Sequence, residues 1–129
     1  MVYSVLEHVD DLAGGYRARR LWIKPGGFLS HPIEFRCHNT ARVWNGHWRY
    51  SDLIWRLIRG RRSYSAHLRL LEENGFSFVG GRTTKSDSHI AHAQLAPRFR
   101  HTTDQDLTTS SALIQAVPRP APAAWRSAA

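Results

Sequence analysis

The 129 residues are enough for one globular domain with a single hydrophobic core and too few for two. Eighteen basic residues, 16 of them arginine, against 10 acidic ones give a net charge of +8. A single cysteine, Cys37, excludes an internal disulfide framework and suits a reducing compartment, and no apolar run has the length of a signal peptide or a membrane span. We therefore expect a cytoplasmic protein with no membrane partner.

The N-terminal segment predicts a strand, a helix and a tight turn. The short apolar run 1–6 is typical of a strand buried on both faces, as in a parallel sheet. Asp10 or Asp11 then caps a helix whose apolar positions recur at near-helical spacing. Lys-Pro-Gly-Gly at 24–27 ends that helix, because proline cannot continue it and glycine adopts a positive φ.

A second strand and a long loop follow. Residues 28–36 predict a strand, in which Pro32 lacks a backbone donor and therefore indicates a sheet edge, a bulge or the strand's end. His31 and Glu34 are expected at or just past its carboxyl end. The loop 37–50 is rich in Asn, His, Trp and Gly, and such loops are where sites are usually built.

Two short helices lead to a further strand. Ser51 caps a helix over 52–58, and a second helix over 65–74 ends at Gly75 before a strand at 76–79. The first of these helices has an apolar stripe that we expect to face inward: Leu53, Ile54, Leu57 and Ile58.

The C-terminal third has weak periodicity until its last strand. Residues 80–110 are polar, with a short helix near 91–95 and a turn at Pro97. The run 112–117 predicts a last strand, and the Pro- and Ala-rich tail 118–129 predicts disorder. We therefore divide the chain into a folded part, 1–117, and a tail, 118–129.

Two motifs at a fixed spacing resemble a known family. They are S-V-L-E-H-V at 4–9 and W-I-K-P-G-G-F at 22–28, and shorter similarities follow at 30–34, 44–51 and 70–76. The pattern is similar to the C-terminal half of class I S-adenosylmethionine-dependent methyltransferases over residues 3–117. There, the first motif follows the fourth strand and lines the pocket, and the second introduces the fifth strand. The resemblance implies an α/β, partial Rossmann-like fold, the C-terminal half of the sheet with flanking helices.

The resemblance also implies roles for particular residues in methyl transfer from S-adenosylmethionine. The cofactor side of the pocket would be formed by Ser4, Val5 and Leu6. Either His8 or His31 would act as the general base, since an imidazole titrates near neutrality. The substrate side would be formed by Glu7, Trp44, Asn45, His47 and Trp48.

Each of these roles has a structural alternative. His8 could face solvent at the start of the helix, and Glu7 could simply favour the positive end of the helix dipole. The aromatic loop could pack over a sheet edge instead of covering a substrate. The acceptor itself is not readable, because small metabolites, lipids, sugars, nucleic acids and proteins all serve as acceptors on this scaffold.

The chain departs from the family most clearly in what it lacks. No G-x-G-x-G motif follows a strand, and no acidic strand end precedes Ser4. In addition, Glu34 stands where the family pattern predicts an aspartate. Compared with that pattern, the chain is shortened at the junction of Tyr64 and Ser65. We therefore expect a truncated or split gene product, or a wrongly started reading frame, that binds the cofactor weakly or not at all by itself. In the alternative reading, the chain is a non-catalytic module that docks to a partner carrying the missing half.

Two further classes compete with the enzyme. The chain could be a non-catalytic docking module, or a basic protein that binds nucleic acid through arginine clusters at 17–20 and 59–62 with nearby tryptophans. Nucleic acid is the less favoured partner, because helix and turn surfaces are usually charged. His89, His92 and His101 form the one conceivable metal cluster, and a solvated polar loop is the better reading, so we assign no metal.

Overall fold

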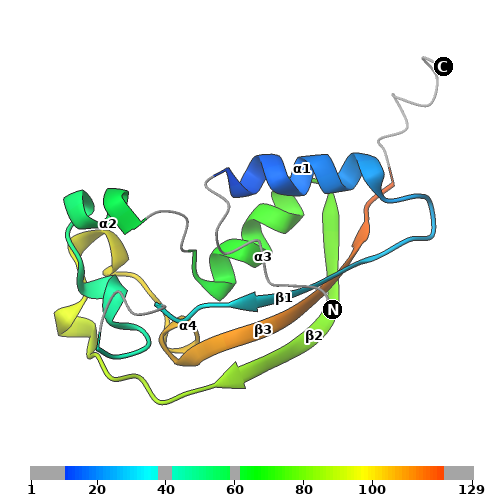
Figure 1. Cartoon of the computed structure of the whole chain (residues 1–129). Coiled ribbons are helices and arrows are strands. Elements are labelled where there is room, and N and C mark those ends of the chain that lie inside the picture. Colours follow the sequence, from blue (N-terminus) through cyan, green and yellow to red (C-terminus); the bar gives the residue numbers. More distant parts are fainter. Residues whose placement is uncertain (1–10, 38–41, 59–61, 121–129) are drawn as a thin grey trace.

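A three-stranded sheet with two helices on one face is the centre of the molecule. The computed structural model describes residues 11–37, 42–58 and 62–120. The strands are β1 (Leu29–Glu34), β2 (Phe76–Lys85) and β3 (Thr109–Pro118), in the order β1-β3-β2. The helices α1 (Leu12–Trp22) and α3 (Tyr64–Glu73) lie on the same side of this sheet (Figure 1).

The sheet confirms the α/β class and corrects the expectation of a parallel sheet for the part described. The central strand β3 is antiparallel to both β1 and β2, so those two outer strands run parallel to each other. The strand expected at 1–6 lies outside the described residues. Buried and more exposed residues alternate along β3, which is the pattern of a sheet with one face packed and the other open.

Helix and turn ends agree with the sequence signals. The Asp11 carboxylate accepts a hydrogen bond from the Gly14 N–H at 2.9 Å and caps α1, and Ser63 caps α3 through the Ala66 N–H. Gly26 and Gly75 have positive φ, as expected for glycines that follow helix ends. Pro32 lies within β1, which is an edge strand of the described sheet and so tolerates a residue without a backbone donor.

The main core fills the layer between the sheet and the two helices. Aromatic rings from α1, α3 and the strands meet there, including Tyr16 and Phe76, whose ring centroids lie 6.4 Å apart. The buried members are Leu12, Tyr16, Leu29, Ile33, Phe35, Tyr64, Leu71, Phe76, Ala112, Ile114 and Ala116.

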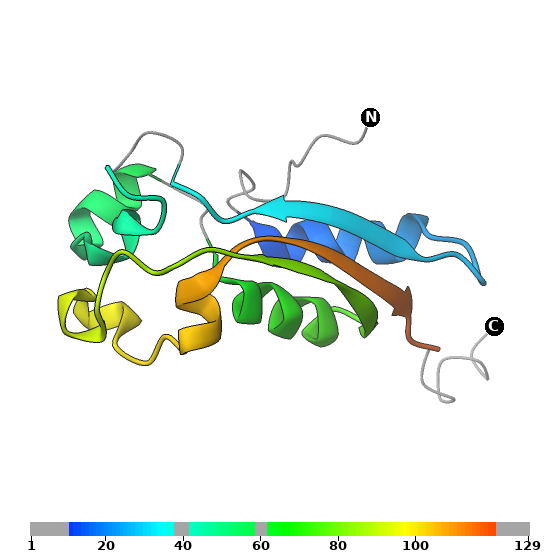
Figure 2. The same cartoon turned by 90° about the horizontal axis from the view of Figure 1, so that it is seen from below.

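A second group of elements lies beyond the carboxyl ends of β1 and β2. We call it the distal lobe and define it as residues 42–58 and 86–108 (Figures 1 and 2). It contains α2 (Asp52–Ile58), α4 (Asp104–Thr108) and the 3-10 helices η2 (Gly46–Arg49), η3 (His92–Gln94) and η4 (Pro97–Phe99). Its own apolar cluster consists of Trp48, Ile90 and Leu107, against which Val43, Trp55, Leu95 and Phe99 pack.

Several expectations about the second half of the chain were wrong. Both β2 and β3 are longer than expected, and α4 occupies part of the segment read as polar loop. On α2, Leu53 is 71% exposed and Ile54 is also exposed, so these members of the predicted stripe do not face inward, while Trp55 of the same helix packs on the lobe. The side chains of 57 and 58 lie outside the described residues.

The tail begins later than predicted. Pro118 is the last residue of β3, and the Arg119 N–H donates to the Gly75 carbonyl at 2.8 Å. The Arg20 guanidinium binds the carbonyls of both Gly75 and Arg119, which holds this end of the chain against the end of α3. Residues 121–129 lie outside the described ranges. None of the helices in the part of the chain that the structure describes is long and apolar enough to cross a membrane.

Candidate functional site

The carboxyl ends of β1 and β2 both lead into the distal lobe (Figure 2). In α/β sheets, ligands bind beyond the carboxyl ends of the parallel strands, so this end of the molecule is the candidate site. Five residues assigned to it by sequence lie outside the described ranges: Ser4, Val5, Leu6, Glu7 and His8. Their roles stay predictions.

His31 lies in the middle of β1 and not at its carboxyl end. It pairs with Ile114 across the sheet, and it is half-buried on the face that carries Leu29 and Ile33. Its Nε2 accepts a hydrogen bond from the Arg19 Nε at 2.9 Å. Burial, and then the positive charge of Arg19, lower the pKa of His31 to about 4, so its ring is neutral and only weakly basic at pH 7.

His67 of α3 is a second histidine held neutral, and the sequence did not suggest it. It is fully buried, and its Nδ1 shares a hydrogen bond with the Tyr16 hydroxyl at 3.0 Å. Burial, and then the charges of Arg62 and His31, lower the pKa of His67 to about 4. Burial also raises the pKa of the Tyr16 phenol, which therefore stays protonated. This pair is part of the main core.

The predicted substrate loop is largely internal. Asn45, His47 and Trp48 are almost fully buried, and His47 stacks on Trp55 with ring centroids 5.6 Å apart. The Trp44 indole N–H donates to the Asp87 carbonyl at 2.9 Å. The structure therefore brings these four residues together as supports of the distal lobe, and His31 is not part of that group.

Asn45 is the main polar anchor of the lobe. Its side-chain amide donates to the Leu107 carbonyl at 3.1 Å and to the Ser88 hydroxyl at 3.0 Å, and that hydroxyl donates to the Ile90 carbonyl at 2.7 Å. One side chain thereby joins the loop after β1 to both ends of the segment between β2 and β3. A buried amide with such partners fixes a single loop geometry.

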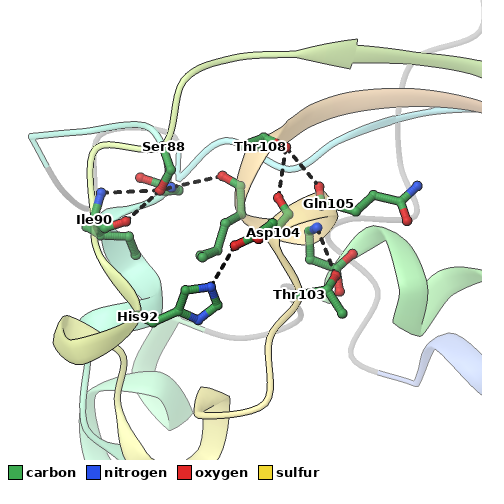
Figure 3. Close-up of polar contacts among 10 residues, drawn as sticks. Ser88, Ile90, His92, Thr103, Asp104, Gln105 and Thr108 are labelled. Atoms are coloured by element: carbon green, nitrogen blue, oxygen red, sulfur yellow. Dashed lines mark hydrogen bonds and ion pairs between the residues drawn. The ribbon is translucent and has the colours of Figure 1, made fainter.

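The segment before β3 is held by contacts that the sequence did not suggest (Figure 3). His92 Nε2 lies 2.7 Å from Asp104 Oδ1 as an exposed pair, and the Thr108 hydroxyl donates to the Asp104 carbonyl at 2.8 Å. The Thr103 hydroxyl accepts from the Asp106 N–H at 3.2 Å and caps α4. A threonine followed by acidic residues is a capping signal, so α4 could have been found from the sequence.

Asp106 joins the lobe to the main fold. Its buried carboxylate accepts hydrogen bonds from both the backbone N–H and the hydroxyl of Ser65, at the start of α3. This contact spans 41 residues of sequence, and no local pattern signals it.

An open cavity of about 640 Å³ lies on the lobe surface. Its lining residues are Arg42, Val43, Gly46, Arg49, Tyr50 and Gln94. By contrast, the α1 arginines proposed as phosphate clamps are engaged within the protein, since Arg19 binds His31 and Arg20 binds two carbonyls. No group of three or more His, Cys, Asp or Glu side chains within 11–37, 42–58 and 62–120 is placed to hold a metal ion.

Comparisons with protein-family models, with curated proteins and with solved structures each found no match to this chain. The described residues form an α/β unit with helices on one face of the sheet and a lobe beyond the carboxyl ends of β1 and β2.

Proposed function

We propose that this chain forms the C-terminal half of an S-adenosylmethionine-dependent methyltransferase domain, in which the distal lobe lies on the acceptor side. The observation that carries the proposal is the direction of the strands: β1 and β2 are parallel, and the last strand, β3, runs in the opposite direction between them. Doubly wound sheets often include such a reversed strand beside parallel ones.

The edge of β1 supports the same proposal. Within the described residues β1 pairs with β3, and in the proposed domain a further parallel strand pairs with its other side. The expected strand at 1–6 precedes α1, and α1 precedes β1. A strand, a helix and a parallel strand in this order form the crossover unit from which such domains are built.

The chain is assigned the acceptor side because it does not contain the usual cofactor loop. No G-x-G-x-G motif occurs in its 129 residues, and the described residues include none of those expected to touch the cofactor. Of the two candidate bases, His8 is preferred, because the Nε2 of His31 already accepts from Arg19 and the pKa of that ring is about 4.

The test is calorimetric titration with S-adenosylmethionine of this chain and of the same reading frame extended upstream in the genomic DNA. The extended protein is expected to bind with a Kd in the micromolar range, and the 129-residue chain at least about 100-fold more weakly, because the resemblance assigns most contacts to the methionine and ribose of the cofactor to the first strands and their glycine loop. Absence of binding by the extended protein contradicts the proposal. Equal binding by both contradicts the need for a second half.

A second candidate, a non-catalytic docking module, is favoured by the apolar surface near the turn between α1 and β1. Leu21, Trp22 and Phe28 are all exposed there, Trp22 by 76%. Exposed apolar groups gathered in one place often mark protein contacts. Sedimentation of the chain before and after Trp22→Ser tests this candidate: self-association that the substitution abolishes supports docking, and a monomer at all concentrations contradicts self-docking through this surface.

A further inference from the structure

The cavity on the distal lobe combines an apolar wall with two arginines that have no ion-pair partner in the part of the chain that the structure describes. Arg42 precedes η2 and Arg49 ends it, and both line the same cavity of about 640 Å³. That size lies within the range of roughly 300 to 1,000 Å³ typical of small-molecule sites. Val43 and the half-buried Tyr50 add apolar and aromatic surface beside the two charges.

The arginines of this cavity differ from most others in the described part of the chain. Arg17, Arg36, Arg69 and Arg98 each lie within ion-pair distance of a carboxylate, and Arg19, Arg20 and Arg119 donate to groups of the protein itself. Arg42 and Arg49 have neither kind of partner among the described residues, and none of the described residues that line their cavity carries a carboxylate. Two guanidinium groups without a counter-charge at one cavity create a positive local potential that attracts anions.

The backbone that holds these arginines is fixed by buried contacts. Between them, Asn45, Gly46, His47 and Trp48 are buried, and the Asn45 amide binds the Leu107 carbonyl and the Ser88 hydroxyl. The Ala96 N–H donates to the Trp48 carbonyl at 3.0 Å, which brings the segment containing Gln94 against η2. The positions of both arginine backbones are therefore set before any ligand arrives, which reduces the entropic cost of binding.

The geometry points to a binding site for a small organic anion, held by Arg42 and Arg49 through a carboxylate or phosphate group, with its apolar part against Tyr50 and Val43. Arginine forks bind either group in a bidentate manner, so the shared chemistry is a planar or tetrahedral oxyanion. The site lies on the lobe beyond the carboxyl ends of β1 and β2, where ligands of α/β proteins bind. This inference concerns binding alone and holds whether or not the chain takes part in methyl transfer.

Calorimetric titration with phenyl phosphate and with benzoate, without S-adenosylmethionine, tests the site. Saturable binding of either probe is expected, and the stronger of the two identifies the preferred oxyanion. Arg42→Gln and Arg49→Gln are each expected to weaken binding about tenfold or more, because hydrogen bonds to charged groups contribute more than neutral ones. Arg42→Lys, which keeps the charge but loses the fork, is expected to lie between the wild type and Arg42→Gln.

Arg82→Gln is the matched control. Arg82 is exposed and lies on the uncovered face of the sheet, where it lines a separate hollow that also contains Glu34. The same loss of charge there is expected to change binding by less than about twofold, because Arg82 does not line the cavity and interactions of exposed charges are screened by salt. Thermal unfolding of all four variants checks that each is folded.

Three results overturn the inference. They are the absence of saturable binding of both probes to the wild type, an effect of Arg82→Gln as large as that of Arg42→Gln, and tight binding of a short single-stranded oligonucleotide that all three glutamine variants weaken equally. The last result indicates non-specific attraction of a basic surface to nucleic acid. Since the cofactor is absent from this titration, its outcome is independent of the test of methyl transfer.

Discussion

The two apolar clusters of this protein are built in different ways. The main core is formed by regular elements, with α1 and α3 on the sheet, and its members are mostly aliphatic and aromatic side chains at periodic positions. The cluster of the distal lobe is smaller, has aromatic rings from two 3-10 helices and from α2, and depends on the buried amide of Asn45. Packing of regular helices and strands forms the scaffold. The lobe needs polar side chains such as Asn45 as hydrogen-bond partners, because few of its backbone groups are paired in β-sheets or long helices.

This difference has a functional side. Loops held by a rigid scaffold carry most binding sites, and the lobe both bears the arginine cavity and follows the strand ends. Regions with few buried apolar contacts also open more readily than core elements. We therefore expect the lobe to be the less stable of the two regions, and the following experiments test that expectation.

The largest effect is expected from Phe76→Ala in the main core. Phe76 is fully buried against Tyr16, and truncating such a ring lowers the free energy of unfolding by about 3 to 5 kcal/mol. Urea unfolding measures this loss of stability.

Trp48→Ala is the matched change in the lobe, and there we expect faster hydrogen exchange of lobe amides with little change in β3. Equal acceleration in both regions would show that they unfold as one unit.

Acid is expected to weaken the main core through His31 and His67. Both rings are neutral in the folded protein with a pKa of about 4, against 6.5 for a free histidine. As the pH falls below about 6.5, the unfolded chain takes up protons that the folded chain does not, so stability decreases. The free energy of unfolding then falls by up to about 1.4 kcal/mol per pH unit for each histidine, and this is the slope of stability against pH.

Urea unfolding at several values between pH 7 and pH 5 measures this dependence. His31→Gln removes one of the two buried titrations and is expected to reduce the slope. A stability that is constant from pH 7 to pH 5 would contradict the burial of neutral histidines in the core.

The smallest effect is expected from Asn45→Ala in the lobe. The substitution removes two hydrogen bonds and leaves the Leu107 carbonyl without that partner, at a cost of about 1 to 3 kcal/mol. Hydrogen exchange at Gly46 and Trp48 measures the loss locally. Ser88→Ala, which removes one of the two bonds, is expected to have a smaller effect. Unchanged exchange in Asn45→Ala would show that the aromatic rings alone hold the lobe.

The sequence predicted the scaffold better than the site. The Asp11 cap and the turn glycines follow from local backbone preferences, and the structure agrees with them. Pro32 was expected at a sheet edge, a bulge or a strand's end, and it lies on an edge strand of the described sheet. The substrate-loop residues were predicted to be near one another, which they are, but Asn45, His47 and Trp48 are buried. Burial depends on what the segment between β2 and β3 places over them, and that segment has no periodicity from which to predict its path.

By itself, the sequence determined the approximate ends of α1 and α3, the turn between α1 and β1, and the presence of the strands β1, β2 and β3. These features depend on a few neighbouring residues. Only the tertiary structure decided the strand order β1-β3-β2, the exposure of Leu53 and the contact between Asp106 and Ser65. These depend on which distant surfaces exclude water together, and on polar partners separated by up to tens of residues, neither of which has a local signature.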